Sequence, residues 1–146
     1  MSWKLEEPGA MQLPGGRMVR GRKFSADVGI MPQWGLYALW REPSTAWPHG
    51  WIRWSDFGLP LDNDRARTLI GQAYERSKVE RVEVGCGGGR GRTGTILAAL
   101  VMLDGLDAAS AVAWVREHYD HGAVETPWQR HWLAGRFWEN SSTTND

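Results

Sequence analysis

The chain has 146 residues, the size of one domain and enough to bury a hydrophobic core without disulfides. Seventeen Lys and Arg balance seventeen Asp and Glu, whereas nucleic-acid-binding proteins usually carry a basic excess. No apolar run approaches the roughly 20 residues that span a bilayer, and the first residues lack the apolar segment of a secretory signal. The single cysteine, Cys86, excludes an internal disulfide and a multi-cysteine zinc site. We therefore expect a cytoplasmic protein with no nucleic-acid partner and no stable membrane association.

The predicted elements alternate between strands and helices. Residues 1–16 are expected to form an N-terminal arm that leads into a short hairpin. After this arm, the hydrophobic pattern predicts strands at 35–40 and 51–54, a helix at 63–76 and a strand at 79–84. It then predicts helices at 93–103, at 108–119 and from 126 onward. Asp62, Asp107 and Thr126 are suitable N-caps for three of these helices.

This alternation predicts the fold class. Strands followed by helices are typical of an α/β fold, here with a central, mostly parallel sheet flanked by helices. We expect a single domain over residues 1–140. The polar residues 141–146 are predicted to form a disordered tail.

A glycine-rich loop between the strand at 79–84 and the buried helix at 93–103 carries the most chemical information. Five glycines between residues 85 and 91 let backbone N–H groups approach a ligand, and the following helix N-terminus favours an anion. The alternative interpretations of residues 85–94 are a flexible Gly/Arg linker and a segment that contacts RNA. The residues predicted to bind phosphate are Gly87, Gly88, Gly89, Arg90, Gly91 and Arg92.

Cys86 lies at the base of this loop. Backbone N–H groups and positive charge favour the thiolate, which is the nucleophilic form of cysteine. A phosphate-binding loop with a cysteine can therefore attack phosphorus and form a covalent phosphoenzyme.

The loop resembles the Cys-x5-Arg signature of the protein tyrosine phosphatases at Cys86, Gly89, Arg92, Thr93 and Gly94. The resemblance implies that Cys86 is the nucleophile and that Arg92 holds the phosphoryl oxygens. It also implies that the Thr93 hydroxyl donates a hydrogen bond to the cysteine sulfur. The family usually has a histidine before the cysteine, where it supports the loop geometry, and this chain has Gly85 there.

A second segment resembles the mobile acid loop of the same family, whose pattern is Trp-Pro-Asp-x-Gly-x-Pro. Trp54, Asp56, Gly58 and Pro60 match it, and Ser55 replaces the first proline. A leaving alkoxide or phenoxide must be protonated, which a positioned carboxylic acid can do. Asp56 is therefore the candidate general acid, with an ordinary turn or cap residue as the alternative.

A third, shorter match lies at residues 125–129. It resembles the family segment Gln-Thr-x-x-Gln, which positions the hydrolytic water, with Gln129 at the second glutamine and Glu125 at the first. A capping box between Thr126 and Gln129 explains the same residues without catalysis. Gln129 is therefore a candidate water-positioning residue with a structural alternative.

Together these segments predict a metal-independent phosphomonoester hydrolase without a cofactor, similar to the compact dual-specificity phosphatases. The favoured substrate is a phosphorylated protein, with phosphotyrosine first, or a small phosphoester. Arg90 supports a phosphoinositide or inositol phosphate as the alternative, and Gly85 supports a phosphate-binding module with little turnover. A basic run, Arg17, Arg20, Arg22 and Lys23, is interpreted as a solvated surface that could also bind part of a phosphorylated substrate.

Overall fold

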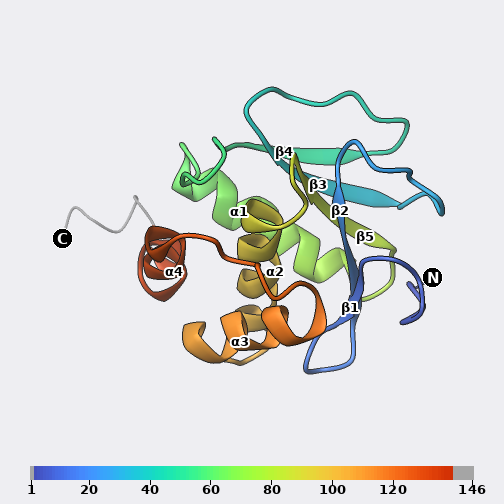
Figure 1. The fold of residues 1–146 in the computed structure, drawn as a ribbon. Helices are drawn as coiled ribbons and strands as arrows, with labels where there is room; N and C mark the ends of the chain where they lie inside the picture. The colour runs from blue at the N-terminus through green and yellow to red at the C-terminus, as the bar shows by residue number, and fades with distance from the viewer. Residues whose placement is uncertain (1, 140–146) are drawn as a thin grey trace.

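The computed structural model describes residues 2–139 and contains a five-stranded sheet in the order β1-β2-β5-β3-β4 (Figure 1). β1 is antiparallel to β2 and the other neighbouring strands are parallel, so the predicted mostly parallel sheet is confirmed. The strands are β1 (Ala10–Gln12), β2 (Met18–Lys23), β3 (Trp34–Leu39), β4 (His49–Arg53) and β5 (Val82–Cys86). The predicted hairpin therefore begins inside the expected arm, and the expected tail at 141–146 lies outside the described residues.

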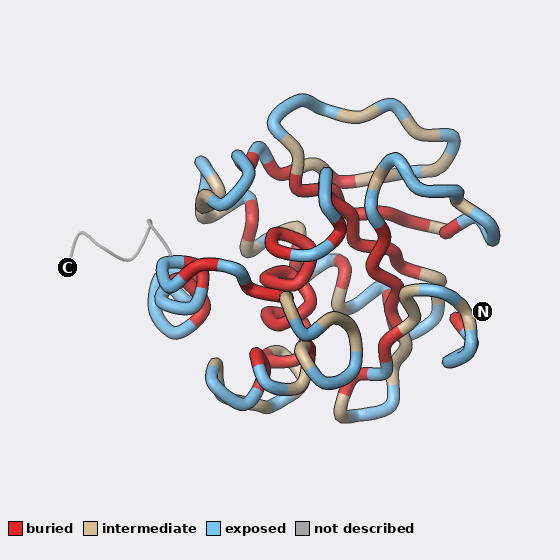
Figure 2. Tube along the Cα trace, viewed as in Figure 1, coloured by how far each residue is buried: buried red, intermediate tan, exposed pale blue. Residues whose placement is uncertain are grey.

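The helices gather on one side of the sheet, with α2 in the middle (Figure 1). They are α1 (Asn63–Arg76), α2 (Gly91–Leu103), α3 (Ala108–His118) and α4 (Pro127–Ala134), followed by a short 3-10 helix, η1 (Arg136–Trp138). Every residue from 91 to 102 is buried, as Figure 2 shows for α2 and the central strands. The prediction of a buried, largely apolar helix at this position is confirmed.

All three predicted helix caps are present, at Asp62, Asp107 and Thr126. The Asp62 carboxylate accepts from the backbone N–H of Arg65 at 3.0 Å, and that of Asp107 accepts from Ser110 at 2.8 Å. The Thr126 hydroxyl likewise accepts from Gln129 N at 3.2 Å. Each cap satisfies one of the backbone N–H groups that a helix start leaves without an intrahelical partner.

The two faces of β5 have different partners. Val82, Val84 and Cys86 belong to the hydrophobic core between the sheet and the helices. Glu83 and Gly85 point to the opposite face, because successive side chains alternate along a strand. β5 ends at Cys86 and α2 begins at Gly91, so the chain turns from strand to helix through the glycine-rich loop.

Candidate active site

The acid loop and the glycine-rich loop meet at one edge of the sheet. β4 and β5 run in the same direction, because each is parallel to β3. The segments that follow them therefore emerge together, where ligands bind in open parallel sheets. They border a cleft of about 220 Å³ that is lined by Asp56, Phe57, Cys86, Gly88, Arg90, Gly91 and Glu125.

The loop wraps around the Cys86 thiol, which is 1% exposed as a residue. The backbone N–H of Gly89 donates to Sγ of Cys86 at 3.2 Å. Gly89 has φ of +68°, and a Cβ there would lie 2.6 Å from the backbone nitrogen of Lys23. Only glycine fits this close approach without displacement. The Tyr119 hydroxyl donates to the carbonyl of Gly89 at 2.5 Å and so holds the loop from its other side.

Arg92 is buried in the first turn of α2 and faces the acid loop. Its Nη1 donates to the carbonyl of Trp54 at 2.9 Å, and its Nη2 lies 3.8 Å from Oδ1 of Asp56. Its Nε is buried and has no hydrogen-bond partner within residues 2–139. Burying an unpaired guanidinium N–H is costly, so this donor is available to an anion in the loop.

Thr93 and Arg90, on either side of Arg92, differ in burial. The Thr93 hydroxyl is buried without a partner in the described part of the chain. The hydrogen bond from Thr93 to the cysteine sulfur is therefore not formed in this structure, although Thr93 follows Arg92 directly. Arg90 is half exposed, lines the cleft, and pairs at 3.5 Å with Asp120.

Three hydrogen bonds hold the backbone of the acid loop, at the carbonyls of Gly58 and Phe57. The indole N–H of Trp54 donates to the carbonyl of Gly58 at 2.7 Å, and Nε2 of Gln129 reaches the same carbonyl at 3.2 Å. The indole N–H of Trp128 donates to the carbonyl of Phe57 at 2.6 Å. Asp56 itself has a side chain that is 62% exposed, so the loop backbone is held while the carboxylate faces the cleft opening.

Gln129 is fully buried and its amide is occupied by backbone groups. Its Oε1 accepts from Glu125 N at 3.0 Å and from Thr126 N at 3.3 Å, and the Thr126 hydroxyl accepts from Gln129 N, which completes a capping box. The structural alternative for these two residues is present in full. Gln129 is absent from the cleft lining, so its role with water stays a prediction.

Glu125 lines the cleft, although the sequence did not identify it as a functional residue. It stands where the family segment has its first glutamine. Val124 before it has φ of +58°, a conformation that β-branched residues rarely adopt. Arg116 holds this turn by donating to the carbonyls of Ala123 and Val124, both at 2.8 Å. The glutamate carboxylate lies against Gly91, where any Cβ would collide with it.

A buried charged cluster lies on the other face of β5, and it corrects the interpretation of the basic run. Arg20 and Arg22 are 5% and 8% exposed rather than solvated. Both donate to the fully buried Glu83, with Nε of Arg22 at 2.8 Å and its Nη2 at 2.9 Å from the two carboxylate oxygens. The Tyr37 hydroxyl donates to the same carboxylate at 2.6 Å.

The cluster changes the pKa values of its members. Burial raises the pKa of Glu83, but hydrogen bonds from Arg22 and Tyr37 and the charges of both arginines outweigh burial and lower it overall. Burial, followed by the charge of Glu83, raises the pKa of Tyr37. The cluster therefore holds an ionised carboxylate, a neutral phenol and two guanidinium cations.

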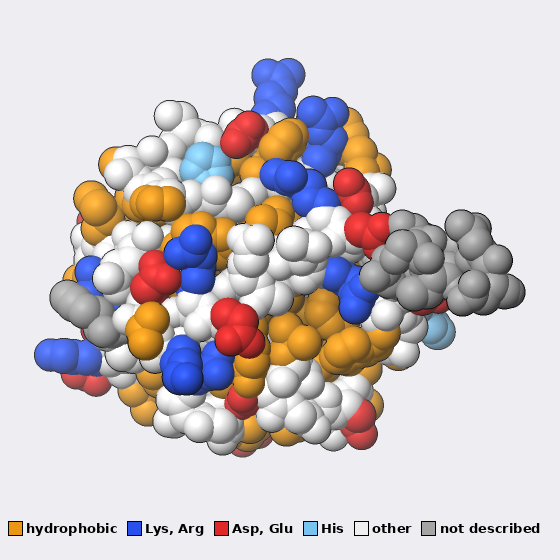
Figure 3. Space-filling model, turned by 180° about the vertical axis from the view of Figure 1, so that it is seen from behind, with side chains coloured by type: hydrophobic (Ala, Val, Ile, Leu, Met, Phe, Trp, Pro, Cys, Tyr) orange, Lys and Arg blue, Asp and Glu red, His pale blue; other side chains and the backbone are white. Residues whose placement is uncertain are grey.

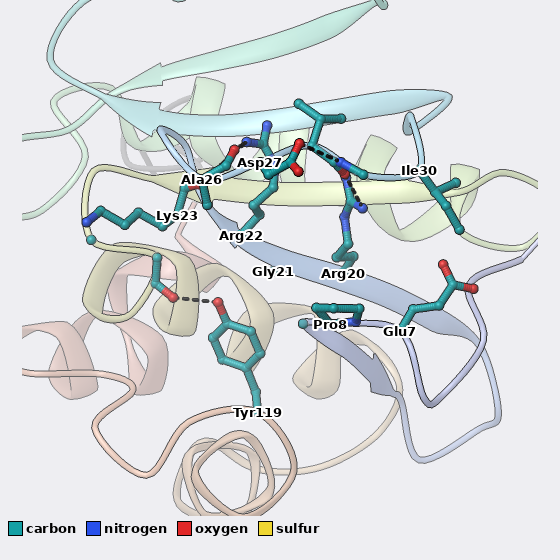
Figure 4. A pocket seen from close by; sticks show the side chains of 15 residues that line it. Glu7, Pro8, Arg20, Gly21, Arg22, Lys23, Ala26, Asp27, Ile30 and Tyr119 are labelled. Atoms are coloured by element: carbon teal, nitrogen blue, oxygen red, sulfur yellow. Dashed lines mark hydrogen bonds between the residues drawn. The ribbon is translucent and has the colours of Figure 1, made fainter.

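A larger cavity of about 620 Å³ adjoins the loop (Figure 4). Gly88 and Gly89 form part of its wall, and Figure 4 shows Arg20, Arg22 and Tyr119 along the same space. Arg20 and Arg22 of the charged cluster therefore border the same cavity as the loop. Tyr119, which donates to the carbonyl of Gly89, borders it too. Among residues 2–139, no group of three or more His, Cys, Asp or Glu side chains is arranged to hold a metal ion.

Known structures share this fold. The chain is similar to a crystal structure of Tk-PTP in the active form, with a TM-score of 0.67, 23% identity, and coverage of 89% of this chain and 96% of the other. It is also similar to a kinase-associated phosphatase whose catalytic-site cysteine is replaced by serine, with a TM-score of 0.67 and 13% identity. That match covers 88% of this chain and 93% of the other.

Sequence relatives come from Methanocaldococcus jannaschii. The uncharacterized proteins MJ0215 and MJECL20 are 38% and 37% identical over 78 residues, which is 53% of this chain. The aligned part spans about half of each relative, 48% and 52%. In the described part of the chain, no helix has the length and apolar character to cross a membrane.

A family model matches residues 48–137, which is more than half of the chain and includes both the acid loop and the cysteine loop. That model describes the DSP-PTPase phosphatase domain of the Swiss Army Knife proteins, PTP-SAK. The chain therefore belongs to this DSP-PTPase phosphatase domain family.

Proposed function

We propose that this domain is a cysteine-dependent phosphomonoester hydrolase that acts through a phosphocysteine intermediate. One observation carries the proposal: a thiol and a carboxylate line a single cleft, beside a buried arginine whose Nε has no partner within residues 2–139. Cys86 and Asp56 line that cleft, and Arg92 lies 3.8 Å from Asp56. Binding of phosphate alone would need neither the thiol nor the acid.

The first step transfers the phosphoryl group to sulfur. The Cys86 thiolate attacks phosphorus, the bond from phosphorus to the leaving oxygen breaks, and Asp56 gives that oxygen a proton. The unpartnered Nε of Arg92 and the loop N–H groups bind the phosphoryl oxygens, whose charge they stabilise in the transition state.

The second step releases phosphate. Water attacks the phosphocysteine, the Asp56 carboxylate accepts its proton, and the sulfur–phosphorus bond breaks to regenerate the thiolate. The buried Thr93 hydroxyl, which has no partner in residues 2–139, is the donor that we assign to the leaving sulfur. Gln129 remains a candidate for positioning the water.

The favoured substrate is a phosphorylated protein, with phosphotyrosine first. The exposed aromatic ring of Phe57 at the cleft suits an aromatic leaving group. An inositol phosphate is the second candidate, because Arg90 brings an additional cation to the cleft lining.

Hydrolysis of p-nitrophenyl phosphate tests the proposal in the purified chain. We expect wild-type turnover that survives EDTA, because Arg92 and backbone N–H groups supply the charge stabilisation. Cys86→Ser should abolish turnover, and Asp56→Asn should lower kcat by roughly 10²–10⁴-fold, the usual contribution of a general acid. Arg92→Lys keeps the charge but loses the planar fork and should also be severely impaired.

Asp107→Asn is the matched control for Asp56→Asn. Asp107 caps α3 at a surface position, and asparagine is an equally good cap, so turnover should stay at the wild-type level. If the folded wild type binds tungstate but shows no turnover, the proposed hydrolase function is contradicted. The chain would then be a phosphate-binding module. Turnover that is indifferent to Cys86→Ser would contradict the phosphocysteine mechanism.

A further inference from the structure

The departure from the family pattern at Gly85 has a structural counterpart in Tyr37. Gly85 pairs in register with Tyr37 on β3 and with Arg22 on β2. A Cβ at Gly85 would lie 2.9 Å from Cδ1 and 3.0 Å from Cε1 of the tyrosine ring. Real Cβ atoms essentially never come closer than 3.0 Å to such a neighbour, and the backbone carbonyl oxygen of Arg22 lies 3.1 Å away. The ring therefore occupies most of the space that a side chain before the cysteine would need.

The Tyr37 ring is fixed in this position. The side chain is fully buried, its hydroxyl donates to Oε2 of Glu83 at 2.6 Å, and the indole N–H of Trp47 donates to the hydroxyl oxygen at 2.7 Å. The ring of Phe24 packs edge-on at 5.1 Å between ring centres. Two directional hydrogen bonds and an aromatic contact leave the ring a single orientation.

The contacts continue from Tyr37 through Glu83 and Arg22 to the carbonyl of Cys86. Glu83, three residues before Cys86, accepts from Arg22, whose Nη1 also donates to the carbonyls of Phe24 and Ala26 at 2.8 Å. Figure 4 shows this arginine and Ala26 at the wall of the larger cavity. The backbone N–H of Phe24 in turn donates to the carbonyl of Cys86 at 2.9 Å.

We infer that Tyr37 is a positioning residue of the phosphate loop. Its ring over Gly85 and its hydroxyl on Glu83 fix the end of β5 that presents the thiol, where the family pattern has a histidine. The changes in kcat/KM that we expect rest on the proposed phosphatase function. The changes in alkylation of Cys86 that we expect do not.

Two substitutions, made singly and together, test the inference. Tyr37→Ala removes the support, and Gly85→His forces a side chain into the ring, so each change should lower kcat/KM for p-nitrophenyl phosphate about 10- to 100-fold, as misplaced catalytic groups do. In the double variant the histidine enters the vacated space. We expect the double variant to be more active than either single variant.

Additive losses in the double variant would overturn the inference, because residues that do not share a space act independently. Tyr37→Phe provides a milder probe in case the alanine variant does not fold, because it keeps the ring and removes only the hydroxyl. Its kcat/KM should fall by a smaller factor than that of Tyr37→Ala.

A second readout does not require turnover. Cys86 is the only thiol of the chain, so its alkylation by iodoacetate, an anion, can be compared with that by neutral iodoacetamide. The ratio of the two rates reports how well the loop attracts an anion. Tyr37→Phe and Tyr37→Ala should both lower the ratio at unchanged pH.

Tyr74→Phe is the matched control. The Tyr74 hydroxyl donates to Oδ1 of Asp104 at 2.7 Å, at the opposite end of α2 from the loop. This variant should lower the melting temperature without changing the alkylation ratio. If the Tyr37 variants also change only the melting temperature, Tyr37 is merely structural and the inference fails. A wild type without hydrolysis would refute the proposed function and still leave this ratio as a test of Tyr37.

Discussion

Two buried arginines share one buried carboxylate behind the glycine-rich loop. Arg20 and Arg22 both pair with Glu83, whose side chain is fully buried. Desolvation of three charges is costly, and the hydrogen bonds among them offset that cost only while all partners are present. The cluster is therefore sensitive to loss of the single anion.

Substitution of this anion gives a prediction with a defined pH dependence. Folding lowers the pKa of Glu83 from its ordinary value of 4.5, so the ionised form stabilises the fold above this pH. That contribution is lost as the pH falls through the lower, folded pKa. Glu83→Gln should reduce the free energy of unfolding by about 3–5 kcal/mol at about pH 7, and the difference from wild type should shrink in acid.

Urea unfolding at several pH values measures this difference. Glu42→Gln is the control, since the Glu42 side chain is 60% exposed and its loss should change stability by less than about 0.5 kcal/mol. A deficit of Glu83→Gln that stays constant with pH would show that the charge of Glu83 is not what stabilises the fold.

At the scale of elements, the start of α4 latches the acid loop. Trp128 holds the carbonyl of Phe57, although both side chains are about half exposed. Trp128→Phe keeps an aromatic ring and removes the indole N–H. We expect kcat for p-nitrophenyl phosphate to fall by about 10-fold, because a general acid that is less well positioned loses part of its contribution. The rate at which iodoacetate alkylates Cys86 should stay unchanged. A parallel fall in this rate would contradict the view that Trp128 acts on the acid loop alone.

The first turn of α2 packs directly on the turn before α4, which explains Gly94. A Cβ at Gly94 would lie 2.5 Å from Cβ and 2.9 Å from Cα of Ala123. Gly94→Ala should destabilise the protein by about 1–3 kcal/mol in urea unfolding, the usual cost of overpacking. Gly71→Ala on α1 is the control: apart from its chain neighbours and the nearby backbone of its own helix, no atom of residues 2–139 lies within 4 Å of the added Cβ, and the substitution should stabilise by about 0.5–1 kcal/mol. Equal effects of the two substitutions would contradict this packing.

At the scale of the whole molecule, the composition balances seventeen basic with seventeen acidic residues, and both kinds are mixed on the one face that Figure 3 shows. Figure 3 shows basic side chains beside acidic ones on the rear face rather than one continuous basic area. On that face, such a distribution gives little of the non-specific electrostatic attraction on which nucleic-acid binding depends.

The sequence predicted the features that depend on local order and missed those that depend on distant pairing. Cys86, Arg92 and Asp56 belong to short motifs, and the strand–loop–helix context of the first two is local, so their meeting at one sheet edge follows from a parallel sheet. The burial of Arg20 and Arg22 was not foreseen, because their partner lies more than 60 residues away on a strand joined through crossovers.

Other misses have local causes. The start of α2 at Gly91 was predicted two residues late, since glycine has a low helix propensity. The strand predicted at 79–84 is β5 at Val82–Cys86, whose buried glutamate interrupts the apolar pattern. Glu125 could not be recognised as a cleft residue, because its direction depends on the left-handed backbone of Val124.

Direct detection of a phosphoryl group on Cys86 would test the central claim most sharply. Wild type is mixed with p-nitrophenyl phosphate, quenched in acid during turnover and analysed as peptides by mass spectrometry, with Cys86→Ser as the blank. The proposed mechanism predicts one phosphoryl group on the peptide that contains Cys86. Turnover with no phosphoryl group on that peptide, or with one on another residue, would contradict the mechanism.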